Sequence, residues 1–415
     1  MIIRIANIQY IFEIELFFLK KIIFFTIIFK RYVYVCRKNL LKQMKEMCLL
    51  SDYQFSNVLV DWYKKNKRDL PWRNTKEPYR IWISEIMLQQ TRVIQGLDYY
   101  LRFLRRFPDI QSLAEAEQEE VLKYWQGLGY YSRARNMHEA AKSIHSNFQG
   151  VFPQRYEDVL ALKGVGSYTA AAIVSLAWNQ PYPVIDGNVY RVLGRLFAVD
   201  VPYDTGKGEK IYEELANMLM NPQQAGLHNQ AIMEFGALQC VPQKPECGQC
   251  PLKDKCLGFA SGNPLQFPIK QHIIKVRNRY FNYFFILHEG NTYLSRRMQK
   301  DIWEGLFEFP LIETEHSMDF EEVQETDAFK KLFHDTGKIT FSMDSNELKH
   351  VLTHQILHAR FYEAEIQKDN LYLQQYIKTP LEQIDDYAVP RLIHRFLSNC
   401  GAVSKYPLKK QVTDK

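Results

Sequence analysis

Residues 160–178 read LALKGVGSYTAAAIVSLAW, in which a Gly-Val-Gly turn separates a short apolar segment from an alanine-rich one. Gly164 and Gly166 permit the tight backbone geometry of a hairpin, and alanine favours a helix after it. Amide groups at the hairpin and at the start of that helix, near Ser167, can face an anion such as a DNA phosphate. The stretch predicts a helix, a hairpin and a helix that bind the DNA backbone without reading bases. A plain interhelical turn closed by glycine would give the same pattern.

The chain is too long for one ordinary core, with 415 residues, so we expect two domains or three. Its composition, 46% hydrophobic and 24% charged residues, indicates that most of it folds. The formal net charge of +6 is compatible with a nucleic-acid partner without requiring one.

Periodicity divides the chain in two. Up to about residue 235 the apolar residues recur at helical spacing, with short punctuation such as RFPDI and NQPYP. After a segment with Gly262, Pro264 and Pro268, stretches rich in aromatic residues, such as RYFNYFFILHEG, indicate strands. We therefore expect an all-α domain followed by an α+β domain. The expected boundaries are an all-α domain over 49–262, a linker over 263–273, an α+β domain over 274–405 and a tail over 406–415.

The first 48 residues, 1–48, are rich in Ile, Phe and Lys. Glu13 and Lys20 interrupt the apolar run, so it is too short for a transmembrane helix, and no small-residue cleavage site of a signal peptide follows it. We favour an upstream extension from a misassigned start, with Met44 or Met47 as the true beginning, over a membrane-surface anchor.

Two carboxylates stand in unlike surroundings. In the segment SEIMLQQTR, residues 84–92, helical spacing places Ile81 and Leu88 on the same face as Glu85, so desolvation should raise the pKa of its carboxyl group. Asp186, in VIDGNV, directly precedes an apolar-patterned helix, where an N-cap is the simpler explanation. A protonated acid paired with an ionised carboxylate is also a familiar arrangement for cleaving bonds at a sugar carbon.

Four of the seven cysteines form a cluster with the spacing C-x6-C-x2-C-x5-C. This pattern excludes a secreted disulfide framework and indicates a metal or cluster site in a reducing compartment. Zinc sites more often contain two C-x2-C pairs, so we favour an iron–sulfur cluster over zinc and over four unlinked thiols. Two lysines between the last two cysteines could contact phosphate. The cysteines are Cys240, Cys247, Cys250 and Cys256, and the lysines are Lys253 and Lys255.

Two further segments carry candidate functional residues. The segment GLGYYSRARNM, residues 127–137, combines aromatic and cationic side chains that suit a protein that extrudes a base from DNA, although a helix-joining turn with a solvated basic edge would look alike. In HVLTHQILH, His350, His354 and His358 recur every four residues, but no nearby carboxylate or cysteine completes a convincing metal site.

These motifs occur together in one order: the helix with Glu85, GLGYYSRARN, LKGVGSYTA, VIDGNV and the cysteine cluster. The ordered set resembles the MutY family of adenine DNA glycosylases, within the endonuclease III superfamily, most clearly over residues 52–270. The resemblance implies a helix-hairpin-helix glycosylase core with a [4Fe-4S] cluster in the loop 240–256. It also implies an enzyme that removes adenine mispaired with 8-oxoguanine or guanine.

The resemblance further assigns roles to single residues. Glu85 would protonate the adenine ring, Asp186 would stabilise the sugar cation, and Asn188 would position a reacting group. Tyr168 stands where strand-cleaving relatives carry a lysine nucleophile, and a phenol cannot form the Schiff base that an amine forms. A monofunctional glycosylase is therefore expected. The residues that would enter the duplex near 8-oxoguanine are Gln90 and Tyr130.

The α+β domain resembles the NUDIX-like recognition domain at the end of this family, most clearly in LSRRMQKDIWEGLFEFP, residues 294–310. The sequence after it lacks the REx2E core of a NUDIX hydrolase, so we expect binding without hydrolysis. Leu352, Thr353 and His354 match a loop that usually reads Phe-Ser-His and contacts 8-oxoguanine. Thr353 keeps the hydroxyl group of this loop, whereas Leu352 lacks its aromatic ring.

The expected partner is double-stranded DNA with A:8-oxoguanine or A:G mismatches, bound by a cytoplasmic monomer without a stable membrane partner and, in a bacterium, associated with the nucleoid. One rival is a glycosylase of this fold for thymine or an oxidised pyrimidine, against which the second domain argues. The other is a catalytically silent DNA-binding sensor. The presence of both Glu85 and Asp186 argues against that rival.

Overall fold

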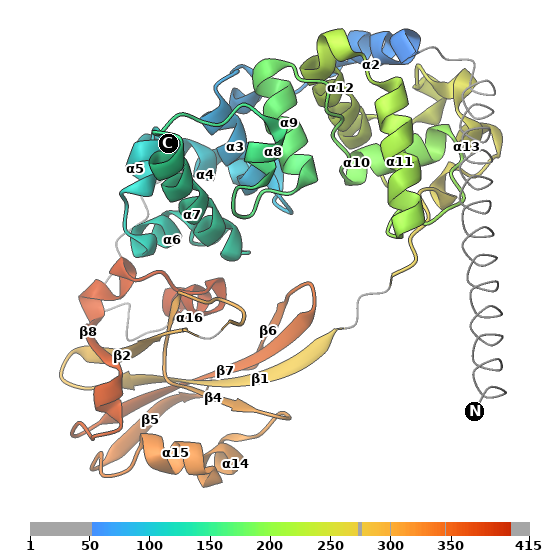
Figure 1. The fold of residues 1–415 in the computed structure, drawn as a ribbon. Coiled ribbons are helices and arrows are strands. Elements are labelled where there is room, and N and C mark those ends of the chain that lie inside the picture. Colours follow the sequence, from blue (N-terminus) through green and yellow to red (C-terminus); the bar gives the residue numbers. More distant parts are fainter. Residues whose placement is uncertain (1–51, 273–275, 299, 345, 400–415) are drawn as a thin grey trace, which may run out of the picture. The chain divides into compact units, whose positions relative to one another are not determined.

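The computed structural model describes residues 52–272, 276–298, 300–344 and 346–399 (Figure 1). The expected N-terminal extension, the C-terminal tail and part of the linker lie outside the described residues. The chain divides into two compact units, so the helical region contributes to both. In the described residues, the first unit combines the segment up to Asp69 with Trp178–Gln271, and the second combines Leu70–Ala177 with the chain from His272 onward.

The first unit is helical. Helix α12 packs against α2 and α10, and the rings of Trp62 and Phe235 meet edge to face with centroids 5.0 Å apart. At the end of α2, the guanidinium of Arg68 pairs with the fully buried Glu234 at 2.6 Å, which satisfies a charge that would otherwise be costly to bury. The helices are α2 (Asp52–Asn66), α10 (Gly187–Leu196), α11 (Gly206–Leu219), α12 (Ala225–Leu238) and α13 (Leu257–Ala260).

The second unit begins with seven helices. Trp82 and Trp125 are fully buried among them, and α7 packs against α5 and α6. None of the helices in the described part of the chain is long and apolar enough to cross a membrane. The helices are α3 (Pro78–Leu88), α4 (Val93–Arg106), α5 (Ile110–Ala114), α6 (Gln118–Trp125), α7 (Ser132–Asn147), α8 (Tyr156–Leu160) and α9 (Ser167–Trp178).

The predicted helix, hairpin and helix are present as α8, residues 161–166 and α9. Gly164 adopts a φ of +76°, which a residue with a side chain rarely adopts. A Cβ at this position would lie 2.6 Å from Cβ of Asn136 on α7, so glycine is also required by the close approach. Both demands explain the glycine that the sequence places there.

The second unit continues with an α+β region. Strands β4, β1, β7 and β5 form one sheet, in which β6 also pairs with β7, and strands β3, β2 and β8 form another. The central pair, β1 and β7, is parallel. The strands are β1 (Arg277–Leu287), β2 (Asn291–Arg296), β3 (Phe307–Glu308), β4 (Leu311–Thr314), β5 (Ile339–Asp344), β6 (Leu348–Val351), β7 (Gln355–Ile366) and β8 (Ile377–Pro380); the helices are α14 (Phe320–Glu325), α15 (Asp327–Leu332) and α16 (Arg391–Asn399).

Alternate residues of β1 face two hydrophobic cores because successive side chains of a strand point to opposite faces. Tyr283 and Phe285 pack in the core that contains Phe396 of α16. Phe284 packs in the core that contains Phe329 of α15. The large sheet is therefore covered by α16 on one face and by α14 and α15 on the other (Figure 1). The predicted order, an all-α region and then an α+β region, is confirmed.

Candidate active site

Glu85 lies in the last turn of α3, in the second unit. The face that the sequence predicted is present, since Ile81 is 1% exposed, whereas Glu85 and Leu88 are half-buried. The hydroxyl of Tyr168, near the start of α9, donates to Oε2 of Glu85 at 2.8 Å. Helix α9, which follows the hairpin, thus places the phenol of Tyr168 against the carboxyl group that the sequence predicts to be an acid.

Gln90 and Tyr130 lie in two turns of the second unit and both have positive φ, 54° and 47°. Gln90 is exposed, directly after α3, and Tyr130 is 46% exposed, just before α7. A positive φ is uncommon for residues other than glycine and recurs at functional sites. The structure therefore presents both side chains to solvent, as entry into a duplex would require.

Asp186 belongs to the first unit and is the N-cap of α10. Its Oδ1 accepts hydrogen bonds from the backbone N–H groups of Asn188, at 2.9 Å, and Val189, at 2.8 Å, and its Oδ2 accepts one from Nδ2 of Asn188 at 2.7 Å. Burial raises the pKa of the Asp186 carboxyl group, while these hydrogen bonds and the charge of Arg191 oppose the shift. The N-cap interpretation and the functional one are therefore compatible. The polar turn expected from the sequence is correct, but that expectation left out the burial.

The position of Asn188 depends on two neighbours that the sequence analysis missed. Gly236 of α12 lies so close that a Cβ there would come within 2.6 Å of Cβ of Asn188. The guanidinium of Arg191 donates to Oδ1 of Asn188 at 2.8 Å and to the carbonyl of Cys240 at 2.7 Å. Hydrogen bonds therefore connect Asp186, Asn188, Arg191 and the first cysteine of the cluster. A spacing of three residues between Asn188 and Arg191 on one helix was the available signal.

A second arginine of α10 holds the cysteine loop. Arg195 is 3% exposed, and its guanidinium donates to the carbonyls of Val241 at 2.7 Å and Pro242 at 2.9 Å and to the sulfur of Cys240 at 3.4 Å. The thiol of Cys256 in turn donates to the carbonyl of Arg195 at 3.4 Å. Both ends of the cysteine cluster are thus attached to one residue.

The four cysteines are free thiols around two 3-10 turns, η3 (Cys247–Gln249) and η4 (Lys253–Lys255). Burial raises the pKa of Cys250 to about 11, with smaller upward contributions from Cys240, Cys256 and Cys247. The four sulfurs are therefore close enough to influence one another, and a set made only of thiols suits a four-iron cluster. In the described ranges, no three His, Cys, Asp or Glu side chains converge as a single metal ion would require.

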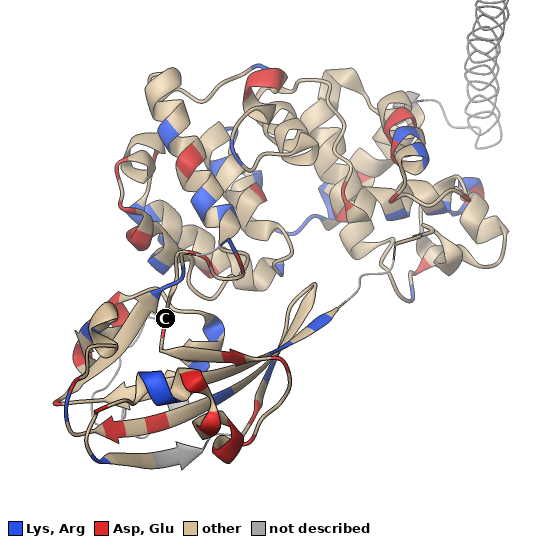
Figure 2. Ribbon diagram, turned by 60° about the horizontal axis from the view of Figure 1, so that its bottom comes forward, with Lys and Arg blue, Asp and Glu red and all other residues tan. Residues whose placement is uncertain are grey.

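The residues predicted to contact phosphate are at the surface. Gly164, Gly166 and Ser167 are exposed at the hairpin and at the start of α9, where the first N–H groups of a helix lack intrahelical partners. Lys253 is exposed and Lys255 is half-exposed in η4. Lys and Arg are spread over the helices and strands with Asp and Glu between them (Figure 2). Phosphate binding at the hairpin therefore stays a prediction, which rests on its exposed N–H groups and on the exposure of Lys253 and Lys255.

The loop predicted to recognise the lesion lines a cavity of about 220 Å³ within the second unit. Its wall is formed by Leu352, Thr353 and His354 together with Tyr130 and Trp303. The hydroxyl groups of Tyr130 and Thr353 share a hydrogen bond of 2.5 Å. The structure thus brings together residues from two motifs, the GLGYY turn and the loop after β6, that are 223 positions apart.

The three regularly spaced histidines do not come together as a metal site in the described residues. Nδ1 of His358 contacts Glu347 at 2.5 Å, and its ring stacks on that of Tyr280 with centroids 4.9 Å apart. His350 packs near Trp303, and His354 is exposed in the turn before β7. Their four-residue spacing reflects a strand, a turn and a strand.

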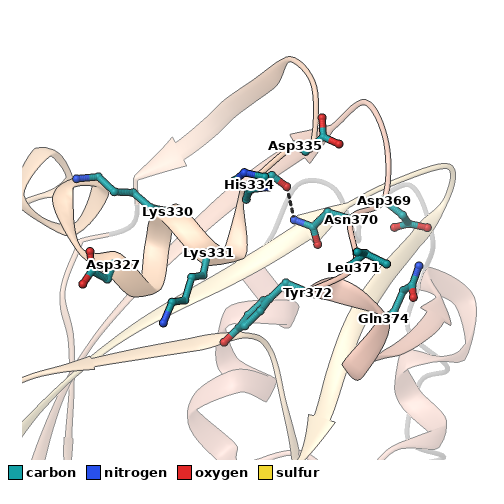
Figure 3. A pocket seen from close by; sticks show the side chains of 10 residues that line it. All are labelled: Asp327, Lys330, Lys331, His334, Asp335, Asp369, Asn370, Leu371, Tyr372 and Gln374. Carbon is teal, nitrogen blue, oxygen red and sulfur yellow. Dashed lines mark hydrogen bonds between the residues drawn. The ribbon is translucent and has the colours of Figure 1, made fainter.

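Another hollow, of about 970 Å³, lies beside α15 in the α+β region, and none of the predicted residues lines it (Figure 3). Its wall includes Lys330, Lys331 and Tyr372. The side chain of Asn370 donates to the carbonyl of His334 at 2.7 Å and fixes the loop that carries Tyr372. Asp327, Asp335 and Asp369 also line the hollow, so its charge is mixed.

Two family models match the chain: the HhH-GPD superfamily base excision DNA repair protein over residues 83–218, and the NUDIX domain over residues 282–399. The first match falls on the helical region, and the second falls on the α+β region.

Known proteins are also similar to this chain. An adenine DNA glycosylase of Buchnera aphidicola subsp. Acyrthosiphon pisum is 38% identical over 263 residues, which cover 63% of this chain and 75% of that protein. An adenine DNA glycosylase of Mus musculus is 43% identical over 215 residues, which cover 49% of this chain and 42% of that protein. A solved thermostable thymine-DNA glycosylase is 28% identical with a TM-score of 0.47, covering 51% of this chain and 97% of that structure.

Proposed function

This chain belongs to the adenine DNA glycosylase family, and we propose that it removes adenine mispaired with 8-oxoguanine or guanine in double-stranded DNA. It would do so by rotating the adenine out of the helix, because the bond to be cleaved is inaccessible within the base stack. It would act as a cytoplasmic monomer, associated with the nucleoid if the cell is bacterial.

The hydrogen bond between Tyr168 and Glu85 is the observation that carries this proposal. A carboxyl group that must give a proton to a base has to be held in one orientation, and the phenol at 2.8 Å does this. Proton transfer from Glu85 to the adenine ring makes adenine a better leaving group. The electron pair of the N-glycosidic bond then departs with adenine, and C1′ of the deoxyribose becomes electron-deficient.

Asp186 would stabilise the positive charge that develops at the sugar. Its carboxylate is fixed by three hydrogen bonds before substrate binds, so little reorganisation is needed at the moment of reaction. Water then adds at C1′, loses a proton and leaves an abasic site. Asn188, which donates to Asp186 and accepts from Arg191, would keep the carboxylate directed at the reacting centre.

The cavity lined by Tyr130, Leu352 and Thr353 supports recognition of the base opposite adenine. An oxidised purine adds a hydrogen-bonding edge, and the hydroxyl groups of Tyr130 and Thr353 are available there as donors or acceptors. Leu352 supplies an apolar surface without an aromatic face. We therefore propose binding of 8-oxoguanine with hydrogen bonds and apolar contact rather than with stacking at position 352.

The phenol at Tyr168 also supports monofunctional chemistry. Strand cleavage by related enzymes requires an amine that forms a Schiff base with the opened sugar, and a hydroxyl group cannot form one. The product strand should remain intact until alkali is added, and borohydride should trap no covalent complex between the protein and DNA.

Cys240, Cys247, Cys250 and Cys256 would hold a [4Fe-4S] cluster. Bound by these residues, such a cluster would cross-link the loop to the end of α12. Purified protein should then be brown, with absorbance near roughly 400 nm, as is usual for thiolate-bound iron–sulfur clusters. Metal analysis that finds zinc alone would exclude the cluster.

A glycosylase assay on three duplexes tests the function. The duplexes carry adenine opposite 8-oxoguanine, adenine opposite guanine, and thymine opposite guanine. We expect release of adenine from the first two and no release of thymine from the third. Absence of adenine release from both would refute the proposal, and release of thymine would favour the pyrimidine-specific alternative.

A further inference from the structure

Arg133, the second residue of the sequence SRA that opens α7 after the GLGYY turn, donates hydrogen bonds to two separate turns. Its Nη1 donates to the carbonyls of Ile86 at 2.8 Å, Met87 at 3.2 Å and Gln89 at 2.6 Å. Its Nη2 donates to the carbonyl of Gly129 at 3.1 Å. One guanidinium therefore joins the end of α3 to the turn that precedes α7.

The contacts at the end of α3 provide hydrogen-bond donors for backbone carbonyls at its C-terminus. The last carbonyls of a helix have no intrahelical N–H partner. In α3 the residues of the last turn are buried or half-buried, so these carbonyls need partners from the protein. A cation at this end also meets the negative pole of the helix dipole. In sequence, Arg133 is 47 positions from Ile86, so this cap comes from a distant element instead of from the helix itself.

The charge of Arg133 has no carboxylate partner in the part of the chain that the structure describes. It lies instead over the rings of Trp125, at 5.3 Å, and Tyr130, at 5.5 Å. Burial lowers the pKa of its guanidinium to about 10, so the group remains cationic at neutral pH. A buried cation without a counter-ion is costly. The buried charge of Arg133 is therefore stable only while the backbone carbonyls and the rings of Trp125 and Tyr130 keep their positions around it.

The two turns that Arg133 joins are those with positive φ at Gln90 and Tyr130. Such conformations persist in residues with side chains only when the surroundings impose them. Arg133 donates to the residue before each of them, Gln89 and Gly129, and it packs on the ring of Tyr130.

We infer that Arg133 is a positioning residue that holds Gln90 and Tyr130 in a fixed mutual arrangement, and with them the last turn of α3 that carries Glu85. The inference rests on the proposed function for the roles of these three residues. One guanidinium would then fix the positions of both the side chains that probe the mismatch and the acid. DNA that displaces either turn would therefore also displace the acid.

The test compares Arg133→Lys with Arg68→Lys. Lysine keeps the charge but lacks the planar fork that reaches several carbonyls at once. Arg68→Lys is the matched control, because it also removes a forked contact, to the buried Glu234, but lies in the first unit, whereas both turns belong to the second. Each variant is measured as the full chain for thermal unfolding, for backbone hydrogen exchange, for binding to mismatched and matched duplexes, and for adenine release in a single turnover.

We expect hydrogen exchange in Arg133→Lys to accelerate together in peptides that cover residues 88–96 and 127–131. Preference for mismatched over matched DNA and the single-turnover rate should each fall roughly tenfold, equivalent to about 1.4 kcal/mol. Arg68→Lys should leave both functional values within about twofold, whatever its effect on unfolding, since Glu234, the partner of Arg68, belongs to the first unit and both turns belong to the second. Equal functional losses in the two variants, or faster exchange in only one of the two peptides, would overturn the inference.

Two measurements keep the inference separate from its premises. If wild-type protein releases no adenine, the proposed function fails, but hydrogen exchange still tests the coupling of the turns. If Arg133→Lys does not fold, the side chain is examined in wild-type protein by NMR after selective 15N labelling of arginine. Restricted rotation of the Arg133 guanidinium is then expected, and free rotation would overturn the inference.

Discussion

The two candidate catalytic carboxyl groups lie at opposite ends of helices. Glu85 is in the last turn of α3, where the helix dipole disfavours a negative charge. Asp186 caps the first turn of α10, where two backbone N–H groups favour one. At Asp186 these backbone hydrogen bonds partly offset the burial that raises the pKa of its carboxyl group. Local backbone geometry, and not only burial, distinguishes an acid from a charge-stabilising group.

The hydrogen-bond partners of the two carboxyl groups also differ in their distance along the sequence. Glu85 accepts a hydrogen bond from one phenol, that of Tyr168, which is 83 positions away in sequence. Asp186 accepts its hydrogen bonds from residues two and three positions away. The Asp186 region is therefore built mainly by local sequence, and the Glu85 region by long-range packing.

Substitution of Glu85 by Gln should have the largest effect. It removes the proton donor and keeps the size of the side chain, so the rate of adenine release in a single turnover should fall by about 10³-fold. Binding to a mismatched duplex and the unfolding temperature should change little. Glu77→Gln is the matched control, since Glu77 caps the other end of the same helix. A rate for Glu85→Gln close to that of Glu77→Gln would exclude Glu85 as the acid.

Substitution of Asp186 by Asn should come second, with a loss of about 10²-fold, because one preorganised electrostatic contact to the transition state is removed. Asparagine is also a good N-cap, so this variant should stay folded. Asp186→Ala should lose activity to a similar degree and in addition about 1 kcal/mol of stability. If Asp186→Asn retains full activity while Asp186→Ala is merely unstable, Asp186 is only a cap.

Substitution of Tyr168 by Phe should have a smaller effect on catalysis. The ring remains but the hydrogen bond to Glu85 is lost, and we expect roughly a tenfold lower single-turnover rate, in line with one hydrogen bond to an acidic group. Tyr124→Phe serves as the control, because the ring of Tyr124 packs on Phe107 in the same unit away from Glu85. Equal rates for the two variants would show that the phenol does not orient the acid.

The smallest effect concerns stability and pH. The folded-state pKa of Asp186 is raised by burial, so the folded protein holds this proton more tightly than the unfolded chain. Wild-type stability should therefore fall as pH rises from the ordinary value, about 3.9, through the raised folded-state value. Asp186→Asn lacks this loss, so its stability relative to wild type should increase over that window, by at most about 1 kcal/mol after screening by solvent. Denaturant unfolding at a series of pH values measures it, and the opposite slope would contradict the burial.

The fold was largely predictable because its signals are local. The glycines of the hairpin, the helical periodicity up to about residue 235 and the aromatic-rich stretch RYFNYFFILHEG each depend on neighbours a few positions apart. The division into two units was not predictable, since it assigns α3 to the same unit as the sheets and α2 to the other. Such a division depends on which helix faces pack together.

The sequence alone determined which groups are available: the carboxyl groups of Glu85 and Asp186, the hairpin glycines and the four thiols. It also determined the N-cap of α10, because a cap is formed by residues that adjoin the helix. The tertiary structure alone decided that Tyr168 donates a hydrogen bond to Glu85, that Arg133 donates to two turns and that Thr353 contacts Tyr130. Directional hydrogen bonds between distant residues depend on how whole helices and strands pack, and no short-range pattern records that.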